Sequence, residues 1–424
     1  MEKKTYSHLD LDVYEDVLDN GLRVFIAPLD RYEAYAKITT LYGARTLEFK
    51  PPLKDEYVKI PAGTAHFLEH KMFAKEDGTD TMSLFQNNGA MSNAYTTAHV
   101  TSYYFMAPNK FYENLGYLLD LVTKPYYTKE NVEKEKGIID QEIKAGFDNP
   151  GEASYYATLL NTFHKIPYRY PVAGYPESIK KITPEILYDS YNTFYHPSNM
   201  VLTITGNVKP DEVIKFVKEY YAKFDYKKMD EIKVMTYDEP RTVFKKEEIL
   251  YKDVTNNILE NAYKVCLDDS PLDLFKTLTY VNIYLDAKFG SISKFNKACF
   301  EDKNIISPIR YMMDSVDNYL FIDFDTEVLE VKEVFDKIYA NINDKTFDEK
   351  DFDLILKNTI KSVILMTDSV NSINNSIDYQ VRKYGNVCYD MYDIYKSLTY
   401  EECLKVINSL DFTNNTRTIT RRAD

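Results

Sequence analysis

The sequence has no tryptophan, only four cysteines and no apolar run that approaches the ~18 residues of a membrane span. The cysteines all lie in the second half and form no C-x-x-C pair, at Cys266, Cys299, Cys388 and Cys403. This pattern gives no disulfide framework, and it argues against a thiolate zinc knuckle and against a zinc deaminase. The polar start of the chain is not typical of a secretory signal, so we expect a cytoplasmic protein with no membrane partner.

The chain also has fewer positively charged than negatively charged residues. Lysine and arginine number 52 against 66 aspartate and glutamate residues, which leaves a net charge of −14. A surface of this sign disfavours nucleic acid as a partner. The 44% hydrophobic and 28% charged residues are typical of a globular protein, and 424 residues predict two or more domains.

Histidine is scarce, with six in the chain, yet two of them fall within five residues, in His66-Phe67-Leu68-Glu69-His70. Residues four apart on a helix lie one turn above each other, so both imidazoles face the same side. Such a pair is a bidentate site for zinc, and H-x-x-E-H is the spacing of the inverted zincins. A histidine on an apolar helix face is more commonly a hydrogen-bonded core residue. A third protein ligand is therefore needed to decide for zinc.

A polar helix predicted over 129–144 offers such ligands. Glu135 and Glu142 are seven residues apart, which puts both carboxylates on one face of that helix. Lysines interleave with these glutamates, so a solvated acidic face is the simpler interpretation of either residue alone.

Local patterns predict where several elements begin and turn. Tyr14 to Pro28 is predicted as a hairpin, with Asp19-Asn20-Gly21 typical of a type I′ turn. Thr64 is expected to be the N-cap of the helix that carries the histidines. The stretch from Met91 to Thr97 predicts a strand.

The order of strand, helix, paired strands and helix occurs in both halves of the chain. This order predicts a duplicated α+β unit of about 200 residues. We expect one domain over 1–225 and a second over 249–424, joined by a charged linker over 226–248 that lacks a clear period.

Three stretches together resemble the pitrilysin family of zinc peptidases, also called the insulinase or M16 family: Thr64–His70, Asn93–Thr96 and Glu133–Ile143. The likeness is strong over roughly 14–225, weak beyond, and greatest to bacterial processing-peptidase-like members. It implies two homologous domains, each a mostly antiparallel sheet covered by helices, which form half of a clamshell.

The resemblance also implies roles for individual residues. His66, His70 and Glu142 become the ligands of a Zn²⁺ ion. Glu69 becomes the general base, and Glu135 a carboxylate that orients one ligand. Two imidazoles, one carboxylate and an open position are what a catalytic zinc requires.

In the family, the strand that matches Met91–Thr97 is a sheet edge that binds substrate backbone. We therefore expect Asn93, Ala94 and Tyr95 to contact a peptide substrate, because edge addition reads main chain rather than side chain. Asn93 also has a simpler interpretation as an ordinary turn residue at a strand end.

The chain departs from the family in its second half. Family enzymes use an Arg and a Tyr, seven apart, from the opposing half to polarise the scissile carbonyl. The stretch 295–306, where this Arg and Tyr are expected, contains neither residue. Arg310 and Tyr311 lie beyond it and are adjacent instead of seven apart. We expect a heterodimer with a paralogue that lacks the zinc motif but carries this Arg and Tyr, although a homodimer remains an alternative.

The resulting hypothesis is a zinc-dependent endopeptidase that cleaves extended, unstructured peptides with zinc-activated water and Glu69 as general base. The alternative is a non-catalytic peptide-binding or maturation subunit whose zinc is structural.

Overall fold

The computed structural model describes residues 1–30, 33–52, 54–387 and 391–423. Cys388 therefore lies outside the described residues. The chain groups into two compact units, each built from three stretches: Met1–Ile143, Pro171–Thr236 and Val363–Asp390 form the first, and Lys144–Tyr170, Tyr237–Ser362 and Met391–Asp424 form the second. The two units are groups of segments in space, whereas the expected domains are continuous ranges of sequence. The domain limits expected at 225 and 249 therefore stay a prediction.

The first unit is built on a seven-stranded sheet of order β1-β2-β3-β9-β4-β8-β7. Its strands are β1 (Glu2–Tyr6), β2 (Leu11–Val17), β3 (Arg23–Pro28), β4 (Ala34–Thr40), β7 (Met91–Thr96), β8 (Thr101–Ala107) and β9 (Met200–Gly206). Among these described strands, β3 and β9 are the only pair that runs in parallel. Every residue of β4 and β9 is buried, so the middle of this sheet is covered on both faces.

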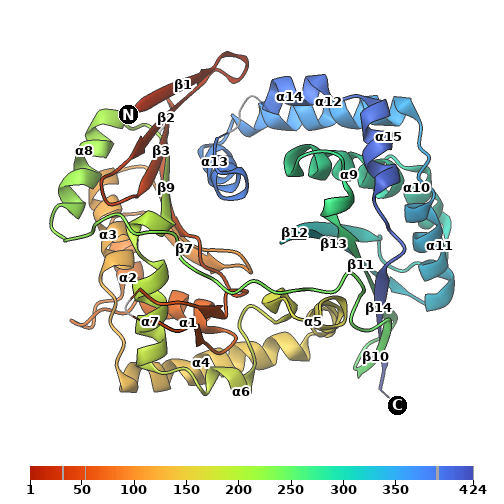
Figure 1. Cartoon of the computed structure of the whole chain (residues 1–424), viewed down its shortest axis with the longest axis horizontal. Coiled ribbons are helices and arrows are strands. Elements are labelled where there is room, and N and C mark those ends of the chain that lie inside the picture. The colour runs from red at the N-terminus through yellow and green to blue at the C-terminus, as the bar shows by residue number, and fades with distance from the viewer. Residues whose placement is uncertain (31–32, 53, 388–390, 424) are drawn as a thin grey trace. The chain divides into compact units, whose positions relative to one another are not determined.

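Helices cover the two faces of this sheet (Figure 1). The helices of this unit include α1 (Thr64–Met72), α2 (Thr81–Asn87), α3 (Phe111–Thr123), α4 (Lys129–Asp148), α7 (Pro184–Phe194), α8 (Pro210–Tyr221) and α13 (Val370–Tyr384). Helix α3 contacts β4 and β8, whereas α13 contacts β3, β4 and β9.

The contact with α13 is polar and fully buried. Thr203 donates a hydrogen bond to Asn374 at 2.8 Å, and Thr205 donates one to the carbonyl of Val370 at 2.7 Å. Lys37 and Asp378, each 1% exposed, form an ion pair at 3.7 Å. Helix α13 therefore supplies hydrogen-bond partners that the polar residues of this sheet require once buried.

The first hairpin forms as predicted, but its turn is of another type. Val17 of β2 pairs with Arg23 of β3. Gly21 has a positive φ of 89° but Asn20 does not, so the turn is not type I′. A Cβ at Gly21 would overlap Ser198.

The second unit holds a five-stranded sheet of order β10-β14-β11-β13-β12. The strands are β10 (Glu247–Lys252), β11 (Asn257–Cys266), β12 (Arg310–Val316), β13 (Tyr319–Val328) and β14 (Asn415–Arg422). β10 and β14 are parallel, and each later pair is antiparallel. This is the order and direction of β3-β9-β4-β8-β7, which confirms the predicted duplication and the α+β class.

Helices also cover the second sheet: α5 (Pro150–Thr162) contacts β10, β11 and β14, and α11 (Val331–Asn343) contacts β11. The other long helices are α9 (Leu274–Phe289), α12 (Glu349–Met366) and α15 (Tyr400–Ser409). Cys266, Cys299 and Cys403 are buried free thiols. Among the described residues, no helix has both the length and the apolar composition needed to cross a membrane.

Candidate metal centre

Helix α1 begins at Thr64, and its N-cap is Gly63, not Thr64 as predicted. Gly63 has a positive φ of 92°, and a Cβ there would overlap the carbonyl oxygen of Ala173. Thr64 instead donates its hydroxyl to the carbonyl of Pro61 at 2.7 Å. The chain thus enters α1 through a left-handed residue in close contact with a distant segment, a conformation that favours glycine.

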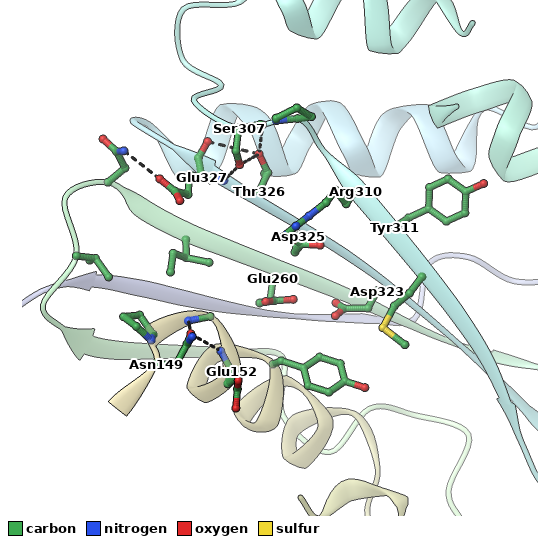
Figure 2. A pocket seen from close by; sticks show the side chains of 18 of the residues that line it. Asn149, Glu152, Glu260, Ser307, Arg310, Tyr311, Asp323, Asp325, Thr326 and Glu327 are labelled. Carbon is green, nitrogen blue, oxygen red and sulfur yellow. Dashed lines mark hydrogen bonds and ion pairs between the residues drawn. The ribbon is translucent and has the colours of Figure 1, made fainter. Parts of the chain in front are cut away.

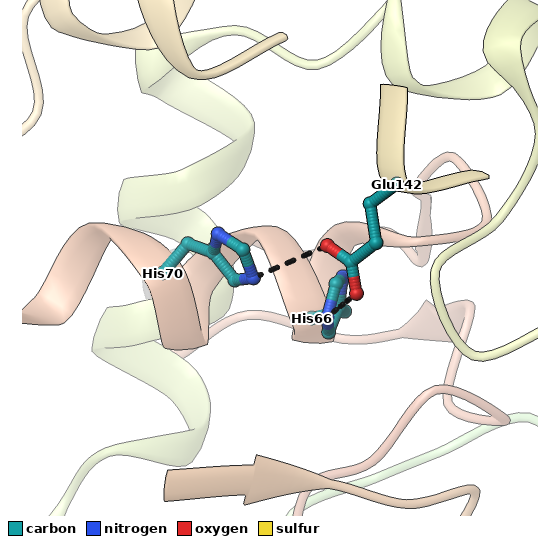
Figure 3. Close-up of side chains that lie close together, drawn as sticks. All are labelled: His66, His70 and Glu142. Atoms are coloured by element: carbon teal, nitrogen blue, oxygen red, sulfur yellow. Dashed lines mark ion pairs between the residues drawn. The ribbon is translucent and has the colours of Figure 1, made fainter. Parts of the chain in front are cut away.

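The three ligands predicted from the sequence lie together (Figure 3). His66 and His70 are one turn apart on α1, with ring centroids separated by 4.6 Å. Glu142 reaches them from α4, with one oxygen 3.5 Å from His66 Nε2 and the other 3.6 Å from His70 Nε2. One ligand atom from each residue lies within 4.8 Å of the other two.

This donor set fits a zinc ion. Ligand atoms held about 2.1 Å from a tetrahedral zinc lie roughly 3.4 Å apart, close to both nitrogen–oxygen distances. Burial lowers the pKa of His66 to about 4, so this imidazole is neutral near pH 7. Its buried Nδ1 has no hydrogen-bond partner among the described groups, so nothing there favours the protonated ring. A neutral imidazole is the form that binds a metal.

Glu135 contacts the side of the His70 ring that faces away from Glu142. Its Oε1 lies 3.1 Å from His70 Nδ1, the nitrogen that faces away from Glu142, and Oε2 lies 3.5 Å from Lys71 Nζ. Burial raises the pKa of the Glu135 carboxyl, but the His70 hydrogen bond and the Lys71 charge outweigh it and hold this pKa below its usual value. Glu135 is therefore an ionised acceptor that fixes the His70 ring.

Glu69 lies on α1 between the two histidines and turns toward the sheet. Its Oε2 accepts a hydrogen bond of 2.7 Å from the Thr96 hydroxyl on β7. Burial raises the pKa of Glu69, and the Thr96 bond offsets part of that rise. A carboxyl whose pKa is moved toward neutrality is suited to proton transfer near pH 7.

Asn93, Ala94 and Tyr95 lie on β7, which is an edge of the seven-stranded sheet. Among the described strands β7 pairs with β8 alone, and Asn93 is exposed while Ala94 and Tyr95 are half-buried. Tyr95 accepts a hydrogen bond of 3.4 Å from Lys37 on the face of the sheet that α13 covers. These residues therefore lie on an edge strand, and Thr96 of the same strand contacts Glu69.

Two residues of this centre had no role assigned from the sequence. Thr96 belongs to the Asn93–Thr96 stretch, but a threonine on a strand carries no signal of its hydrogen-bond partner. Lys71 directly follows the motif, and only its 5% side-chain exposure and its contact with Glu135 single it out. Neither partner could be inferred without the packing of α1 against α4 and β7.

Comparison with known proteins gives matches over both halves of the chain. Residues 59–174 match the family described as Insulinase (Peptidase family M16), and residues 181–286 match the one described as Peptidase M16 inactive domain. The chain is 39% identical over 302 residues to the uncharacterized zinc protease YmfH of Bacillus subtilis (strain 168), which covers 70% of this chain and 69% of that protein. It is 30% identical over 168 residues to the mitochondrial-processing peptidase subunit beta of Caenorhabditis elegans, or 39% of this chain and 37% of that protein.

Solved structures with the same fold include an M16-like peptidase from Alicyclobacillus acidocaldarius. The TM-score is 0.90 at 28% identity, and the match covers 98% of this chain and 99% of that chain. The periplasmic protease PqqL from Escherichia coli shares the fold at a TM-score of 0.74 and 17% identity. There the match covers 97% of this chain but 48% of that chain.

Proposed function

The chain belongs to the insulinase family, peptidase family M16, and from this premise we propose that it is a zinc endopeptidase acting on extended, unstructured peptides. The observation that carries the proposal is the meeting of His66, His70 and Glu142 within 4.8 Å. Two imidazoles and one carboxylate are the ligand set of zinc sites that keep a fourth position open for substrate.

Zinc, when held by these three residues, supplies a Lewis acid that polarises a peptide carbonyl and lowers the pKa of water. Glu69 takes a proton from the attacking water and donates it to the leaving amine. The Thr96 hydrogen bond holds Glu69 Oε2 and so leaves Oε1 for this transfer. Glu135 and Lys71 keep the His70 ring in its binding orientation.

The substrate is proposed to add to β7 as a further strand. An edge strand offers unpaired backbone N–H and C=O groups, which bind main chain of any sequence. Asn93, Ala94 and Tyr95 would contact the peptide, and Thr96 continues the same strand to Glu69. Addition there places a scissile bond close to the general base.

A structural zinc in a non-catalytic peptide-binding subunit is the competing function. The description of an inactive domain applies to residues 181–286, and the three metal ligands and Glu69 all precede that stretch. A purely structural site has no use for the half-buried carboxylate of Glu69 beside its ligands. These two observations favour the peptidase.

Glu69→Gln tests the proposal, because the amide keeps the shape of the side chain but cannot accept a proton. The variant is expected to retain about one zinc per chain and to lose about 10²- to 10⁴-fold in peptide cleavage, the range that general-base removal covers. Zinc is measured by atomic emission and cleavage by mass spectrometry of an unfolded peptide. Glu76→Gln, an exposed glutamate beyond α1, is the matched control. Unchanged turnover in Glu69→Gln would remove the proposed base.

We further propose that the working enzyme pairs this chain with a paralogue. The chain matches about half the length of PqqL, so two such chains correspond to that protein in size. Arg310 of this chain donates its Nε to Asp325 at 2.9 Å, and Tyr311 donates its hydroxyl to Asp286 at 2.6 Å. Both are therefore engaged within their own unit, and a partner is the proposed source of the donors that stabilise the oxyanion.

A further inference from the structure

Two threonine hydroxyls connect Glu69 to the interior of the first sheet. Thr96 of β7 donates to Glu69 Oε2 at 2.7 Å, and its Oγ1 lies 3.3 Å from Oγ1 of Thr101 on β8. The two threonines are direct partners in the antiparallel register, so their side chains project to the same face of the sheet. The proposed general base is therefore linked through Thr96 to a second strand.

Thr101 is held firmly by its surroundings. It is 0% exposed, and its hydroxyl donates to the carbonyl of Tyr42 at 3.0 Å. Tyr195, at the end of α7, lies near this hydroxyl, and its phenol oxygen is 2.8 Å from that of Tyr103. Burial raises the pKa of both phenols, and the charge of Glu69 contributes to the rise, so both stay neutral at pH 7. Thr101 is thus surrounded by fixed, uncharged groups.

The available protons define how the two threonines are oriented. Each hydroxyl carries one proton, and an ionised Glu69 can only accept. The Thr96 proton therefore points to Glu69, which leaves only lone pairs of Thr96 Oγ1 for Thr101. The Thr101 proton has two acceptors within reach, the Tyr42 carbonyl and Thr96 Oγ1. Contact with a fixed hydroxyl on one side and a carboxylate on the other favours a single side-chain rotamer of Thr96.

We propose that Thr101 is a positioning residue for peptide cleavage, which orients the Thr96 hydroxyl so that Thr96 holds the Glu69 carboxylate in place. The inference rests on the proposed function of Glu69 as general base. Because Thr101 is fully buried, it cannot touch a peptide and acts through Thr96. A base must lie within reach of the proton that it takes, and a displacement of about 1 Å can cost about 10²-fold in rate.

Thr101→Val tests the proposal, because valine keeps the shape of the side chain but lacks the hydroxyl. Cleavage of an unfolded peptide is measured with the full-length, zinc-loaded chain, together with the protein that co-purifies with it. We expect kcat to fall about 10- to 100-fold, with KM and zinc content unchanged. Thr101→Ser keeps the hydroxyl and is expected to retain most of the wild-type kcat. An unchanged kcat in Thr101→Val would overturn the proposal.

Thr39→Val is the matched control. Thr39 of β4 is also 0% exposed, and its Oγ1 lies 2.9 Å from Oγ of Ser102. Ser102 follows Thr101 on β8, so Ser102 and its register partner Thr39 project to the opposite face of the sheet. Thr39→Val therefore removes a buried hydroxyl contact from the same sheet without affecting Glu69, and kcat should not change. Equal losses of kcat in the two valine variants would show a merely structural role and overturn the proposal.

A double variant tests whether Thr101 acts through Thr96. Thr96→Val should lower kcat at least as much as Thr101→Val does. Combining the two should lower kcat no further than Thr96→Val alone, because residues that act as a unit are not additive. Losses that multiply in the double variant would mean that Thr101 acts by another route, against the proposal.

Crystal structures of the zinc-free chain give a readout that does not depend on activity. In the wild-type chain the Thr96 hydroxyl is expected to contact Glu69 Oε2, and in Thr101→Val we expect Thr96 to adopt another rotamer and Glu69 to shift. An unchanged Thr96 and Glu69 in the variant would contradict the proposal. If Thr101→Val does not fold, Thr101→Ala compared with Thr101→Ser gives the same tests of kcat and of structure.

Failure of this inference and failure of the peptidase proposal give different results. Full cleavage by Glu69→Gln would remove the proposed base, and with it the role of Thr101. Loss of cleavage in Glu69→Gln together with an unchanged kcat in Thr101→Val would leave the peptidase and remove only the positioning role.

Discussion

At the scale of single residues, the two histidines proposed as zinc ligands are held in different ways. His70 is oriented by Glu135, and Glu135 is kept ionised by His70 and Lys71. His66 has no comparable partner at Nδ1 in the described part of the chain. The two imidazoles are therefore held unequally. Loss of Glu135 should weaken zinc binding more than it lowers the free energy of unfolding.

Glu135→Gln should weaken zinc binding by about 10- to 100-fold, the range for loss of a group that orients a histidine ligand. The amide can still accept from His70 Nδ1, but it no longer carries the charge that pairs with Lys71. Competition with a fluorescent chelator measures the affinity. Glu133→Gln on the same helix, where Glu133 is exposed and pairs with Lys136, should leave the affinity unchanged. Equal losses in both variants would contradict an orienting role.

At the scale of elements, α1 is placed by the turn that precedes it. Gly63 combines a left-handed φ with a close approach to Ala173, whereas Gly78 has a φ of 79° and open space around its Cα. The two glycines thus differ in steric surroundings but share the backbone conformation. Comparing them separates backbone strain from packing.

Gly63→Ala should lower the free energy of unfolding by at least about 2 kcal/mol, since it adds a steric overlap to the strain of a left-handed alanine. Gly78→Ala should cost only about 1 kcal/mol, from strain alone. Chemical denaturation of the zinc-free chain measures both changes. A loss at Gly63 no larger than that at Gly78 would show that the segment around Ala173 moves away readily.

The paired strands β11 and β13 give the second unit a dependence on pH. Burial and the charge of Asp325 raise the pKa of Asp323 to about 7 (Figure 2), although a hydrogen bond with Glu260 lowers it, and burial together with the charge of Asp323 raises the pKa of Glu260. An unfolded aspartate titrates near about 4. Between these values the folded state binds more protons, so the stabilisation is full below about pH 4 and is lost as pH rises to about 7.

Asp323→Asn should therefore flatten the fall in stability between pH 4 and pH 7, by up to about 4 kcal/mol. The measurement is the free energy of unfolding at several pH values, with Glu327→Gln as the control of equal charge change. The charged groups near Asp323, namely Glu260, Asp325 and Arg310, are unchanged in both variants. Parallel pH profiles for the wild-type chain and Asp323→Asn would contradict an unusually high pKa.

At the scale of the whole molecule, activity is proposed to require a second chain. The purified chain alone is expected to bind zinc yet to cleave peptides at least about 10²-fold more slowly than its complex with a partner, the loss seen when one oxyanion donor is absent. The measurement is cleavage before and after adding the M16-type protein that co-purifies with the chain, identified by mass spectrometry. Full activity of the isolated chain as a homodimer would overturn this expectation.

Much of this molecule could be inferred without coordinates, because the signals concerned are local or repeat along the chain. His66 and His70 must share a helix face, since a helix repeats every 3.6 residues. The matching order of elements in the two halves predicted the duplicated α+β unit, which the shared order and direction of five strands in each sheet confirms. Resemblance to a family then supplied Glu142, which lies 72 residues beyond His70.

Other features were decided only when distant segments met. The sequence by itself could not indicate that α13 buries Lys37, that Ala173 requires a glycine at position 63, or that Glu260 and Asp323 are buried together. A helix or strand period specifies which side of an element is apolar, but it does not specify which other segment will cover that side. Tertiary packing determines which segment covers that side. It thereby also determines the charge state and the hydrogen-bond partners of the polar groups that become buried.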